Sequence, residues 1–375
     1  MSRVGIMSMQ RIANYGSFLQ AYALKQLIES LGHKVEFVDY HIGAPVTKDN
    51  ADNRNKYVRK IEKGLETFRY KAPLSHKLAF IQYKQSYGKK YMPLLGISEE
   101  MNYNPELDCL VIGSDEVFNC IQKNRNVGYS PELFGKDNRA KKMITYAASF
   151  GNTTIEKLDK YGKKDEVGEL LSKFDALSAR DMNTGKIIQS LVGSSPVYHL
   201  DPVLVYDYMN CCGQIPDIKP TEKYLILYAY SGRISDKEAD WIAAYAKKKR
   251  LKVYTIGGIQ KCADRFIDCS PFEVLAYFKN ADEVVTDTFH GSIFSIITHR
   301  RFTTLIRKSV GNSYGNEEKM TDLLERLQLT GHMTVNIADV NKINSQVIDY
   351  KAVDTILQEK RNDTLNYLQE KLCTY

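Results

Sequence analysis

No stretch of this 375-residue chain contains the roughly 18 consecutive apolar residues that a membrane-spanning helix needs. The N-terminus lacks the pattern of a secretory signal peptide and leads straight into an apolar segment that starts at Val4. The seven cysteines show neither repeated C-x-x-C spacing nor the spacing of zinc ligands. These absences predict a cytoplasmic protein that has free thiols and no metal.

The positive charge is concentrated in one segment of the chain. Residues 54–91 contain eleven Lys and Arg and two Glu, a net charge of +9, which leaves −2 of the chain's +7 for the remainder. The aromatic residues interleaved with these charges are Tyr57, Phe68, Tyr70, Phe80, Tyr83, Tyr87 and Tyr91. Such a segment suits an anionic membrane surface or a polyanionic substrate, and a solvated helical insertion has the same spacing. No nucleic-acid-binding module is recognisable, so no nucleic-acid partner is expected.

Short apolar runs alternate with helical patterns along the chain, which predicts βαβ units on parallel sheets. The predicted strands are Val4–Ser8, Val35–Tyr40, Asp108–Ile112, Met143–Ala148, Asp175–Ala179, Tyr224–Ala229, Lys252–Ile256, Glu283–Thr286 and Phe302–Leu305. The predicted helices are Ser17–Leu31, Asp236–Lys249, Pro271–Lys279, Gly291–His299, Lys319–Leu327 and Asn344–Leu372.

The length of the chain and one change of composition predict two domains. Pro, Gly and Cys gather between Asp201 and Pro220, which marks a boundary. We expect an N-terminal Rossmann-like domain, residues 1–205, with the basic segment 54–92 as a helical insertion. A C-terminal Rossmann-like domain follows, residues 221–343, and residues 344–375 form a helix that packs back on the first domain. Two doubly wound domains facing a cleft are the GT-B-like plan, which many transferases acting on sugars use.

The turn that follows Thr286 is the strongest candidate for a functional site. His290 stands where an apolar strand ends and a helix begins, between Asp287 and Gly291. Ligands bind at the carboxyl ends of strands in open α/β sheets, and the N-terminus of a helix attracts anions. An imidazole there can exchange protons with a substrate near neutral pH. A histidine that only caps the helix is the structural alternative.

Two turns in the first half of the chain carry further polar groups. In the turn Asn14-Tyr15-Gly16-Ser17, we expect Ser17 to cap the next helix and Gly16 to allow close approach of an anion. Asp115, which follows Gly113 and Ser114, is a candidate general base. Compensation of the charge at a helix N-terminus is the alternative role for Asp115.

Two arginines also stand at predicted turns. Arg180 ends the fifth predicted strand, and Arg233 follows the sixth. The planar guanidinium group suits bidentate recognition of a carboxylate or a phosphate. A structural ion pair is the alternative role for Arg180.

The turns together resemble those of a known family. The motifs are Asn-Tyr-Gly-Ser-x-Leu-Gln-Ala-Tyr-Ala-Leu at 14–24, Val-Ile-Gly-Ser-Asp-x-Val-Phe at 111–118, Ser-x-Arg-Asp at 178–181, Asp-Pro at 201–202 and Thr-Asp-x-Phe-His-Gly-Ser-x-Phe-Ser at 286–295. In this order they resemble the polysaccharide pyruvyl transferase family. The resemblance implies an enzyme that transfers pyruvate from phosphoenolpyruvate, as a ketal, to a sugar of a cell-surface polysaccharide or of its lipid-linked precursor, as in capsule or exopolysaccharide biosynthesis.

The resemblance also assigns roles to residues. The family's histidine falls on His290, the expected general acid, and its donor-binding arginine falls on Arg180; Asp115 is the expected base. The remaining donor-side candidates are Arg233, Asp287, Gly291, Ser292 and Lys319, and the acceptor-side candidates are Asn14, Tyr15, Gly16, Ser17 and Ser114. We expect no cofactor beyond phosphoenolpyruvate as donor substrate. We expect the acceptor to be a polyprenyl-diphosphate-linked sugar, with peripheral contact at the inner face of the membrane.

Two positions depart from the family pattern. Thr288 stands where many members have arginine, and Lys319 stands where some members have it, so the donor site has less guanidinium charge. Arg233, Arg307 and Lys319 are the cations that can replace this charge. The alternatives to pyruvyl transfer are a GT-B glycosyltransferase that uses a nucleotide sugar and a non-catalytic glycan-binding subunit.

Overall fold

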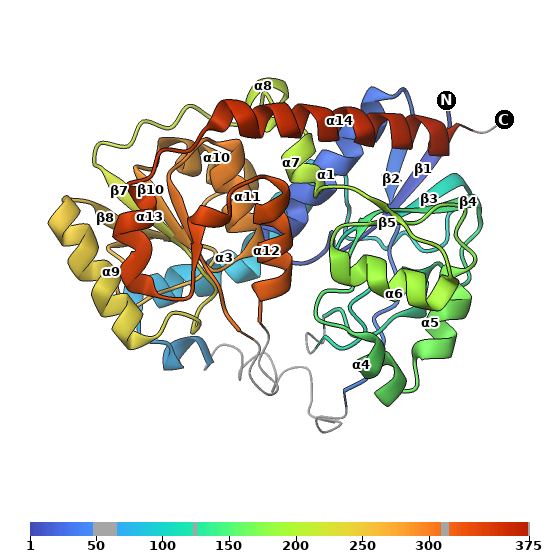
Figure 1. The fold of residues 1–375 in the computed structure, drawn as a ribbon, viewed down its shortest axis with the longest axis horizontal. Coiled ribbons are helices and arrows are strands. Elements are labelled where there is room, and N and C mark those ends of the chain that lie inside the picture. Colours follow the sequence, from blue (N-terminus) through green and yellow to red (C-terminus); the bar gives the residue numbers. More distant parts are fainter. Residues whose placement is uncertain (48–65, 123–125, 309–314, 374–375) are drawn as a thin grey trace. The chain divides into compact units, whose positions relative to one another are not determined.

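The chain forms two α/β units, each with a six-stranded sheet (Figure 1). The computed structural model describes residues 1–47, 66–122, 126–308 and 315–373. Unit 1 comprises Met1–Asp49, Met92–Tyr206 and Asp354–Tyr375, and unit 2 comprises Asn50–Tyr91 and Asp207–Val353. The chain passes from unit 1 to unit 2 within the composition change at 201–220. Two parallel-sheet domains confirm the predicted fold class.

The sheet of unit 1 has the strand order β2-β1-β3-β4-β5-β6, and all its pairs are parallel. The strands are β1 (Arg3–Met7), β2 (Lys34–Phe37), β3 (Leu107–Asp115), β4 (Ala140–Ala148), β5 (Ser178–Ala179) and β6 (Val197–Tyr198). The central strand β3 is a run of fully buried apolar residues, Cys109 to Ile112. Such a run, without alternation, is what a parallel strand covered on both faces requires.

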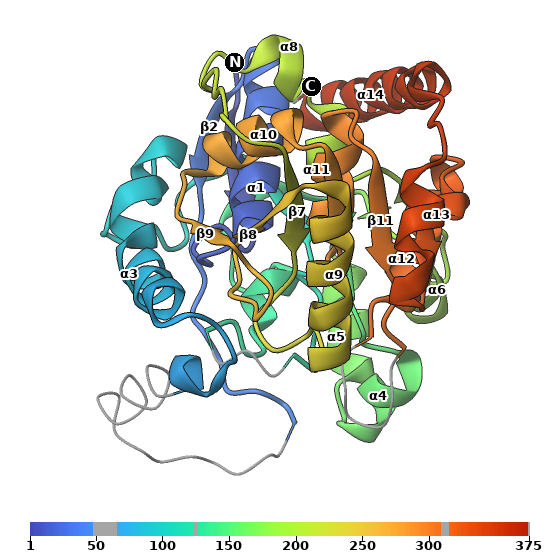
Figure 2. The ribbon, with the colours of Figure 1, turned by 90° about the vertical axis from the view of Figure 1, so that its left-hand side faces the viewer.

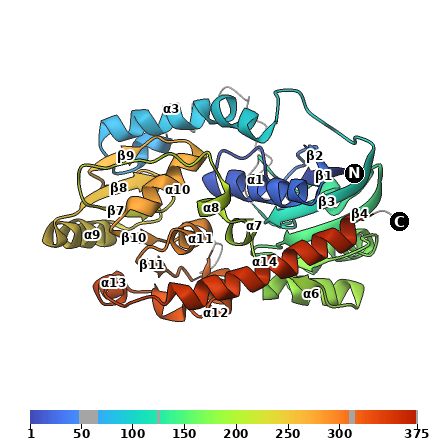
Figure 3. The ribbon, with the colours of Figure 1, turned by 90° about the horizontal axis from the view of Figure 1, so that it is seen from above.

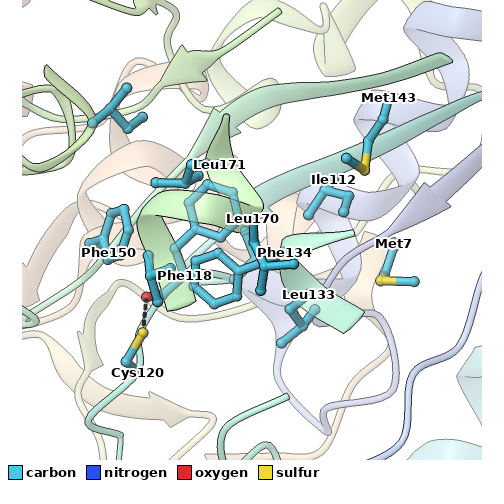
Figure 4. Close-up of a cluster of buried hydrophobic side chains, with 14 of the residues drawn as sticks. Met7, Ile112, Phe118, Cys120, Leu133, Phe134, Met143, Phe150, Leu170 and Leu171 are labelled. Carbon is cyan, nitrogen blue, oxygen red and sulfur yellow. Dashed lines mark hydrogen bonds between the residues drawn. The ribbon is translucent and has the colours of Figure 1, made fainter. Parts of the chain in front are cut away.

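Helices and a cluster of aromatic side chains complete unit 1. The helices are α1 (Tyr15–Ser30), α4 (Ile155–Lys160), α5 (Lys164–Leu171), α6 (Met182–Val192), α7 (Pro202–Val205) and most of α14 (Tyr350–Leu372), with short 3₁₀ turns η1 (Met92–Leu95) and η2 (Pro131–Phe134). Phe118 stacks on Phe134 with ring centroids 4.6 Å apart, and Leu170 and Leu171 of α5 lie beside them (Figure 4). From Asp354 onward α14 belongs to unit 1, where Tyr367 donates a hydrogen bond to the backbone of Thr145 at 2.9 Å.

The sheet of unit 2 has the order β12-β11-β10-β7-β8-β9 and is also parallel throughout. Its strands are β7 (Tyr224–Tyr228), β8 (Lys252–Ile256), β9 (Arg265–Ile267), β10 (Glu283–Thr286), β11 (Phe302–Leu305) and β12 (Met333–Thr334). Its helices are α3 (Leu74–Tyr91), α8 (Tyr208–Cys211), α9 (Asp236–Lys249), α10 (Pro271–Asn280), α11 (Phe289–Ile297), α12 (Glu317–Arg326) and α13 (Val340–Asn344), with 3₁₀ turns η3 (Thr330–His332) and η4 (Ile337–Asp339).

The sequence predicted that the basic segment is an insertion in the first domain. The structure shows instead that the described part of this segment belongs to unit 2. Figures 2 and 3 show α3 beside β9, the edge strand of this sheet. The reason is aromatic packing, because the rings of Phe80 and Tyr83 lie 5.8 and 6.3 Å from that of Phe266 in β9. Tyr83 and Tyr87 are buried, so these two tyrosines do not face solvent. Residues 54–65 of the predicted insertion lie outside the described residues.

Each sheet has one position where the strand order reverses. In unit 1 the chain runs from β1 outward to β2 and then returns to β3 on the other side of β1. In unit 2 it runs from β7 to β8 and β9 and then returns to β10 on the other side of β7. Loops that leave such neighbouring strands diverge, and the crevice at the carboxyl ends of these strands is where open α/β sheets bind ligands. We call these two positions the β1/β3 and β7/β10 switch points.

Candidate functional site

At the β1/β3 switch point of unit 1, the following loops bring Ser17 to Asp115. Ser17 Oγ donates a hydrogen bond to Asp115 Oδ2 at 2.8 Å, and the backbone N–H of Glu116 donates to Oδ1 at 2.9 Å. Asp115 has a φ of 75°, a left-handed conformation that costs about 1 kcal/mol or more for a residue other than glycine. A strained backbone together with a carboxylate held at both oxygens is typical of functional side chains.

The N-cap of α1 differs from the prediction and explains why Ser17 reaches Asp115. Asn14, not Ser17, caps the helix, since its Oδ1 accepts from the backbone N–H of Gly16 at 2.8 Å and of Ser17 at 3.4 Å. The hydroxyl of Ser17 is thereby available to Asp115. The sequence predicted that this turn can hold an anion, but the backbone N–H groups of Gly16 and Ser17 donate to Asn14 instead. The neighbouring Tyr15 is buried.

Arg180 lies at the end of β5 in a buried ion pair. Its Nη1 is 3.0 Å from Asp201 Oδ2 and 3.8 Å from Asp115 Oδ1. Burial by itself would lower the pKa of Arg180, but the carboxylates of Asp201 and Asp115 outweigh this effect and raise the pKa. The structural ion pair considered for Arg180 is therefore present. Asp201, which the sequence showed only as part of an Asp-Pro motif, is its partner.

The hydroxyl of Ser114 is used within unit 1. The side chain is fully buried and donates a hydrogen bond to the carbonyl of Ala147 at 3.1 Å. The carbonyl of Ser114 accepts from Ser8 at 3.0 Å, and Ser8 in turn accepts from Gln20 at 2.9 Å. This network supports the turn that carries Asp115.

At the β7/β10 switch point of unit 2, α11 begins two residues earlier than predicted. Thr288 is its N-cap, with Oγ1 accepting from the backbone N–H of Gly291 at 3.0 Å. His290 therefore lies within the first turn, half-buried, and its ring is 5.5 Å from that of Phe289 and 6.0 Å from that of Phe294. His290 is not the cap, because Thr288 has that role.

Gly291 and Ser292 hold the start of α11 against the sheet. A Cβ at Gly291 would collide with the hydroxyls of Thr286 and Thr288, so the close packing of the turn requires glycine. Ser292 is fully buried and shares a hydrogen bond of 2.8 Å with the hydroxyl of Thr304. Both residues contribute to the geometry of the turn through contacts within unit 2.

Asp287 is fully buried beside two other charged groups. Arg307 Nε lies 3.6 Å from Asp287 Oδ2, and Arg307 Nη1 donates to Glu238 Oε1 at 2.6 Å. Among the described residues, none donates a hydrogen bond to either carboxylate oxygen of Asp287. Burial raises the pKa of Asp287, and the charges of Arg233 and Arg307 offset only part of that effect. Asn316 holds this arrangement by donating to the carbonyl of Asp287 at 2.8 Å and accepting from the N–H of Arg307 at 2.7 Å.

The two switch points thus carry most of the candidate residues that the sequence indicated in the turns.

A family model described as polysaccharide pyruvyl transferase matches residues 14–309, well over half of the chain. The chain belongs to the polysaccharide pyruvyl transferase family. No curated protein is similar enough to count as a match.

Solved structures similar to this family member show its fold. A putative UDP-N-acetylglucosamine 2-epimerase from Listeria monocytogenes is 8% identical, with 97% of this chain and 94% of that chain covered and a TM-score of 0.50. The UDP-GlcNAc 2-epimerase of Methanocaldococcus jannaschii is 9% identical, with 98% and 100% covered and a TM-score of 0.50. An O-GlcNAc transferase mutant from Thermobaculum terrenum is 11% identical, with 99% of this chain but only 66% of that chain covered and a TM-score of 0.45. The two epimerase structures, with a TM-score of 0.50, show that the fold of this family member is GT-B-like.

The structure gives a local reason for one departure from the family's arginine pattern. Thr288 uses its hydroxyl to cap α11, which an arginine at this position would not do. Of the three cations that can replace the missing charge, Arg307 is paired with Glu238. The guanidinium group of Arg233 lies 4.6 Å from the ring centroid of Tyr230, and Lys319 Nζ lies 6.0 Å from that of Phe289.

Sequence reasoning missed Glu238 and Asn316 as parts of this arrangement. Glu238 stands in the capping box Ser235-x-x-Glu238 of α9, a signal that is visible in the sequence but indicates only a helix start. Its second partner, Arg307, is 69 residues away, so no local sequence pattern predicts this ion pair. Asn316 gives no sequence signal at all, since it precedes an ordinary helix.

The described parts of the chain contain neither a cluster of metal ligands nor a helix suited to crossing a membrane. In residues 1–47, 66–122, 126–308 and 315–373, no three His, Cys, Asp or Glu side chains are grouped so as to hold a metal ion. No helix in these ranges combines the length and apolar character that crossing a bilayer demands.

Proposed function

We propose that this family member transfers pyruvate from phosphoenolpyruvate to a sugar of a cell-surface polysaccharide precursor, forming a cyclic ketal. Membership of the family supports the reaction class. The observation that carries the proposal is the hydrogen bond of 2.8 Å between Ser17 and Asp115 at the β1/β3 switch point. This bond orients the carboxylate of Asp115 at the carboxyl ends of the strands, where open α/β sheets bind substrates. A general base has to be positioned in this way.

The reaction needs an acid, a base and cations. Protonation of the methylene carbon gives an oxocarbenium-like centre at C2, which one sugar hydroxyl attacks. The C2–O bond to phosphate breaks, and a second hydroxyl of the same sugar closes the ketal. Of the two protons that the hydroxyls lose, one is accounted for in the new methyl group and the other leaves with phosphate.

We assign these roles to residues at the two switch points. Asp115 accepts the proton of the attacking hydroxyl, with Ser17 holding it in position. His290, in the first turn of α11, donates a proton to the methylene carbon or to the departing phosphate, and the positive end of the helix favours the donor's negative charges nearby. Arg180 and Lys319 contribute positive charge for the carboxylate and the phosphate of the donor.

The polar side chains of unit 1 favour a sugar as the acceptor. At the β1/β3 switch point, Asn14 caps α1, Ser17 lies in the first turn of α1, and Asp115 ends β3. Carboxylate, amide and hydroxyl groups hydrogen-bond sugar hydroxyls well. We propose a polyprenyl-diphosphate-linked sugar, used by a cytoplasmic enzyme at the inner face of the membrane.

Incubation with phosphoenolpyruvate and a panel of polyprenyl-diphosphate-linked sugars tests the proposal. The expected result is release of inorganic phosphate together with a product whose mass has increased by one pyruvate minus one water. Parallel reactions receive nucleotide sugars instead. Release of a nucleoside diphosphate there, without phosphate release from phosphoenolpyruvate, would make the protein a glycosyltransferase and refute the proposal.

The assignment of Arg180 to the donor has a separate test in Arg180→Lys. Lysine keeps the charge but loses the planar fork, so the KM for phosphoenolpyruvate should rise while the KM for the acceptor stays constant. An unchanged donor KM would restrict Arg180 to its ion pair with Asp201.

A further inference from the structure

Helix α3 has two apolar faces, and only one of them is covered. Tyr83 and Tyr87 are buried, and Phe80 packs on Phe266, so an aromatic stripe holds the helix on unit 2. Leu74 and Leu78 lie one helical turn apart on the opposite side, where they are 62% and 55% exposed. Ile81, at the next turn, shares their side because residues at i, i+4 and i+7 face the same way.

Lysines flank the exposed stripe. At about 100° per residue, Lys77 and Lys84 lie to one side of Leu74 and Leu78, and Lys89 lies to the other. Over residues 66–91 the chain has six Lys and Arg and one Glu, a net charge of +5. A strip of aliphatic side chains, with Lys77 and Lys84 on one side and Lys89 on the other, therefore runs along α3.

A fourth apolar side chain lies next to the start of this strip. Phe68 is 44% exposed, and Lys77 Nζ donates to its carbonyl at 2.9 Å and lies 6.0 Å from its ring centroid. The segment is anchored on α9 by an ion pair of 2.5 Å between Lys71 and Asp236. We name Phe68, Leu74, Leu78, Lys77, Lys84 and Lys89 the α3 outer face.

We propose that the α3 outer face docks on an anionic lipid surface. Single exposed apolar residues are common in proteins, but an aliphatic stripe on one helix face with lysines on both sides is the pattern of helices that lie in a membrane interface. The leucines and Phe68 enter the boundary between headgroups and acyl chains. The lysines extend their stems along the helix and place their charges among the headgroups.

The charge decides in favour of anionic lipid over a neutral apolar partner. A second copy of this chain would bring an equal cluster of positive charge against the first, which is unfavourable. This surface differs from the one the sequence suggested, because Tyr83 and Tyr87 point into unit 2 and aliphatic side chains take their place outside. The proposal deepens the proposed function, in which the enzyme acts at the inner face of the membrane, by naming the surface that contacts lipid. Lipid binding is measured without any reaction, so this proposal can fail while pyruvyl transfer stands, and the reverse.

Cosedimentation of the full chain with lipid vesicles is the test. We expect binding to vesicles of phosphatidylcholine mixed with phosphatidylglycerol, weak binding to phosphatidylcholine alone, and weakening by salt. Leu74→Ser combined with Leu78→Ser should weaken binding roughly tenfold or more, because the area the two leucines bury in the interface is lost. Lys77→Gln, Lys84→Gln and Lys89→Gln together should weaken binding roughly a hundredfold, since each basic residue contributes a factor of about five.

Matched variants elsewhere on the chain serve as controls. Val347→Ser removes an apolar side chain that is 92% exposed, and the triple exchange Lys186→Gln, Lys247→Gln, Lys248→Gln removes the same charge from α6 and α9. Both should bind the mixed vesicles as the wild type does. Circular dichroism confirms that each variant is folded, and the leucine exchanges, at side chains that are more than half exposed, keep the test valid if a lysine variant unfolds.

Three outcomes would overturn the proposal. The wild type is absent from the vesicle pellet; the α3 variants bind as well as the wild type; or the control triple exchange loses as much binding as the α3 triple exchange. A change of oligomeric state in the leucine variants, without a change in vesicle binding, would identify a second copy of the chain as the occupant and would also overturn it.

Discussion

Replacing Arg180 by methionine should destabilise unit 1 strongly, because the arginine is paired inside the protein. The side chain is 4% exposed and lies 3.0 Å from the fully buried carboxylate of Asp201, with Asp115 at 3.8 Å. Methionine fills similar space but leaves two carboxylates without their cation. Breaking a buried pair by removing one partner typically costs about 3–5 kcal/mol, and we expect about 3 kcal/mol because Asp201 keeps the N–H of Val203 as a donor.

A double-mutant cycle separates the ion pair from the loss of packing. Asp201→Asn keeps the cap of α7 but removes the charge, so the combination with Arg180→Met should recover at least about 1 kcal/mol relative to additivity. Hydrogen exchange of the most protected amides in β3 reports the opening free energy of unit 1 separately from that of unit 2. Arg139→Met, on the surface, is the control and should change stability by no more than about 0.5 kcal/mol.

The reasoning fails if Arg180→Met costs less than about 1 kcal/mol, or if the two exchanges are additive. Either result would mean that Asp201 does not hold Arg180 in solution. A large loss of stability, by contrast, would require that any loss of activity in Arg180 variants be corrected for the unfolded fraction.

The other predictions concern the two switch points. His290→Ala should lower kcat about 10²–10⁴-fold while leaving the unfolding transition unchanged, and activity above a tenth of wild type would exclude a general acid there. Ser17→Ala should lower kcat more than it changes either KM, with partial rescue in Ser17→Thr, because the hydroxyl orients Asp115; equal kcat in all three proteins would contradict this role. Asp287→Asn should stabilise unit 2 at pH 7, since burial raises the pKa of Asp287 and its stabilising contribution is lost as pH rises through that pKa. The gain should disappear below about pH 4, where Asp287 is protonated in both states, and a gain that persists there would show that charge is not the cause.

Much of the secondary structure follows from local pattern alone. The predicted bounds of α9, β8, β10 and β11 are those of the structure, and most other predicted elements differ by a few residues. Apolar periodicity and capping signals act between residues that are neighbours in the chain, so the sequence displays them directly. The edge strands β6, β9 and β12 were not predicted, because two or three residues carry too little pattern.

The order of the motifs was also determined by sequence. The turns at 14–17, 114–115 and 286–291 were recognised as candidate sites because strand-to-helix transitions with Gly, Ser and Asp are visible locally. The sequence did not show that Asn14 caps α1, which leaves the hydroxyl of Ser17 to Asp115, 98 residues further along the chain. Whether a hydroxyl caps its own helix or binds a distant carboxylate depends on where the sheet places that carboxylate.

Tertiary structure alone decided the pairing of charges and the direction of the faces of α3. Arg180 with Asp201, and Arg307 with Glu238, are brought together by strands and helices far apart in sequence. In α3 both sides of the helix are apolar, and no local pattern favours burying tyrosine and exposing leucine. The ring of Phe266 in β9 decides this, because aromatic side chains gain area and ring contacts that leucine does not offer. Local pattern therefore determines the elements, and the sheet topology determines which side chains meet.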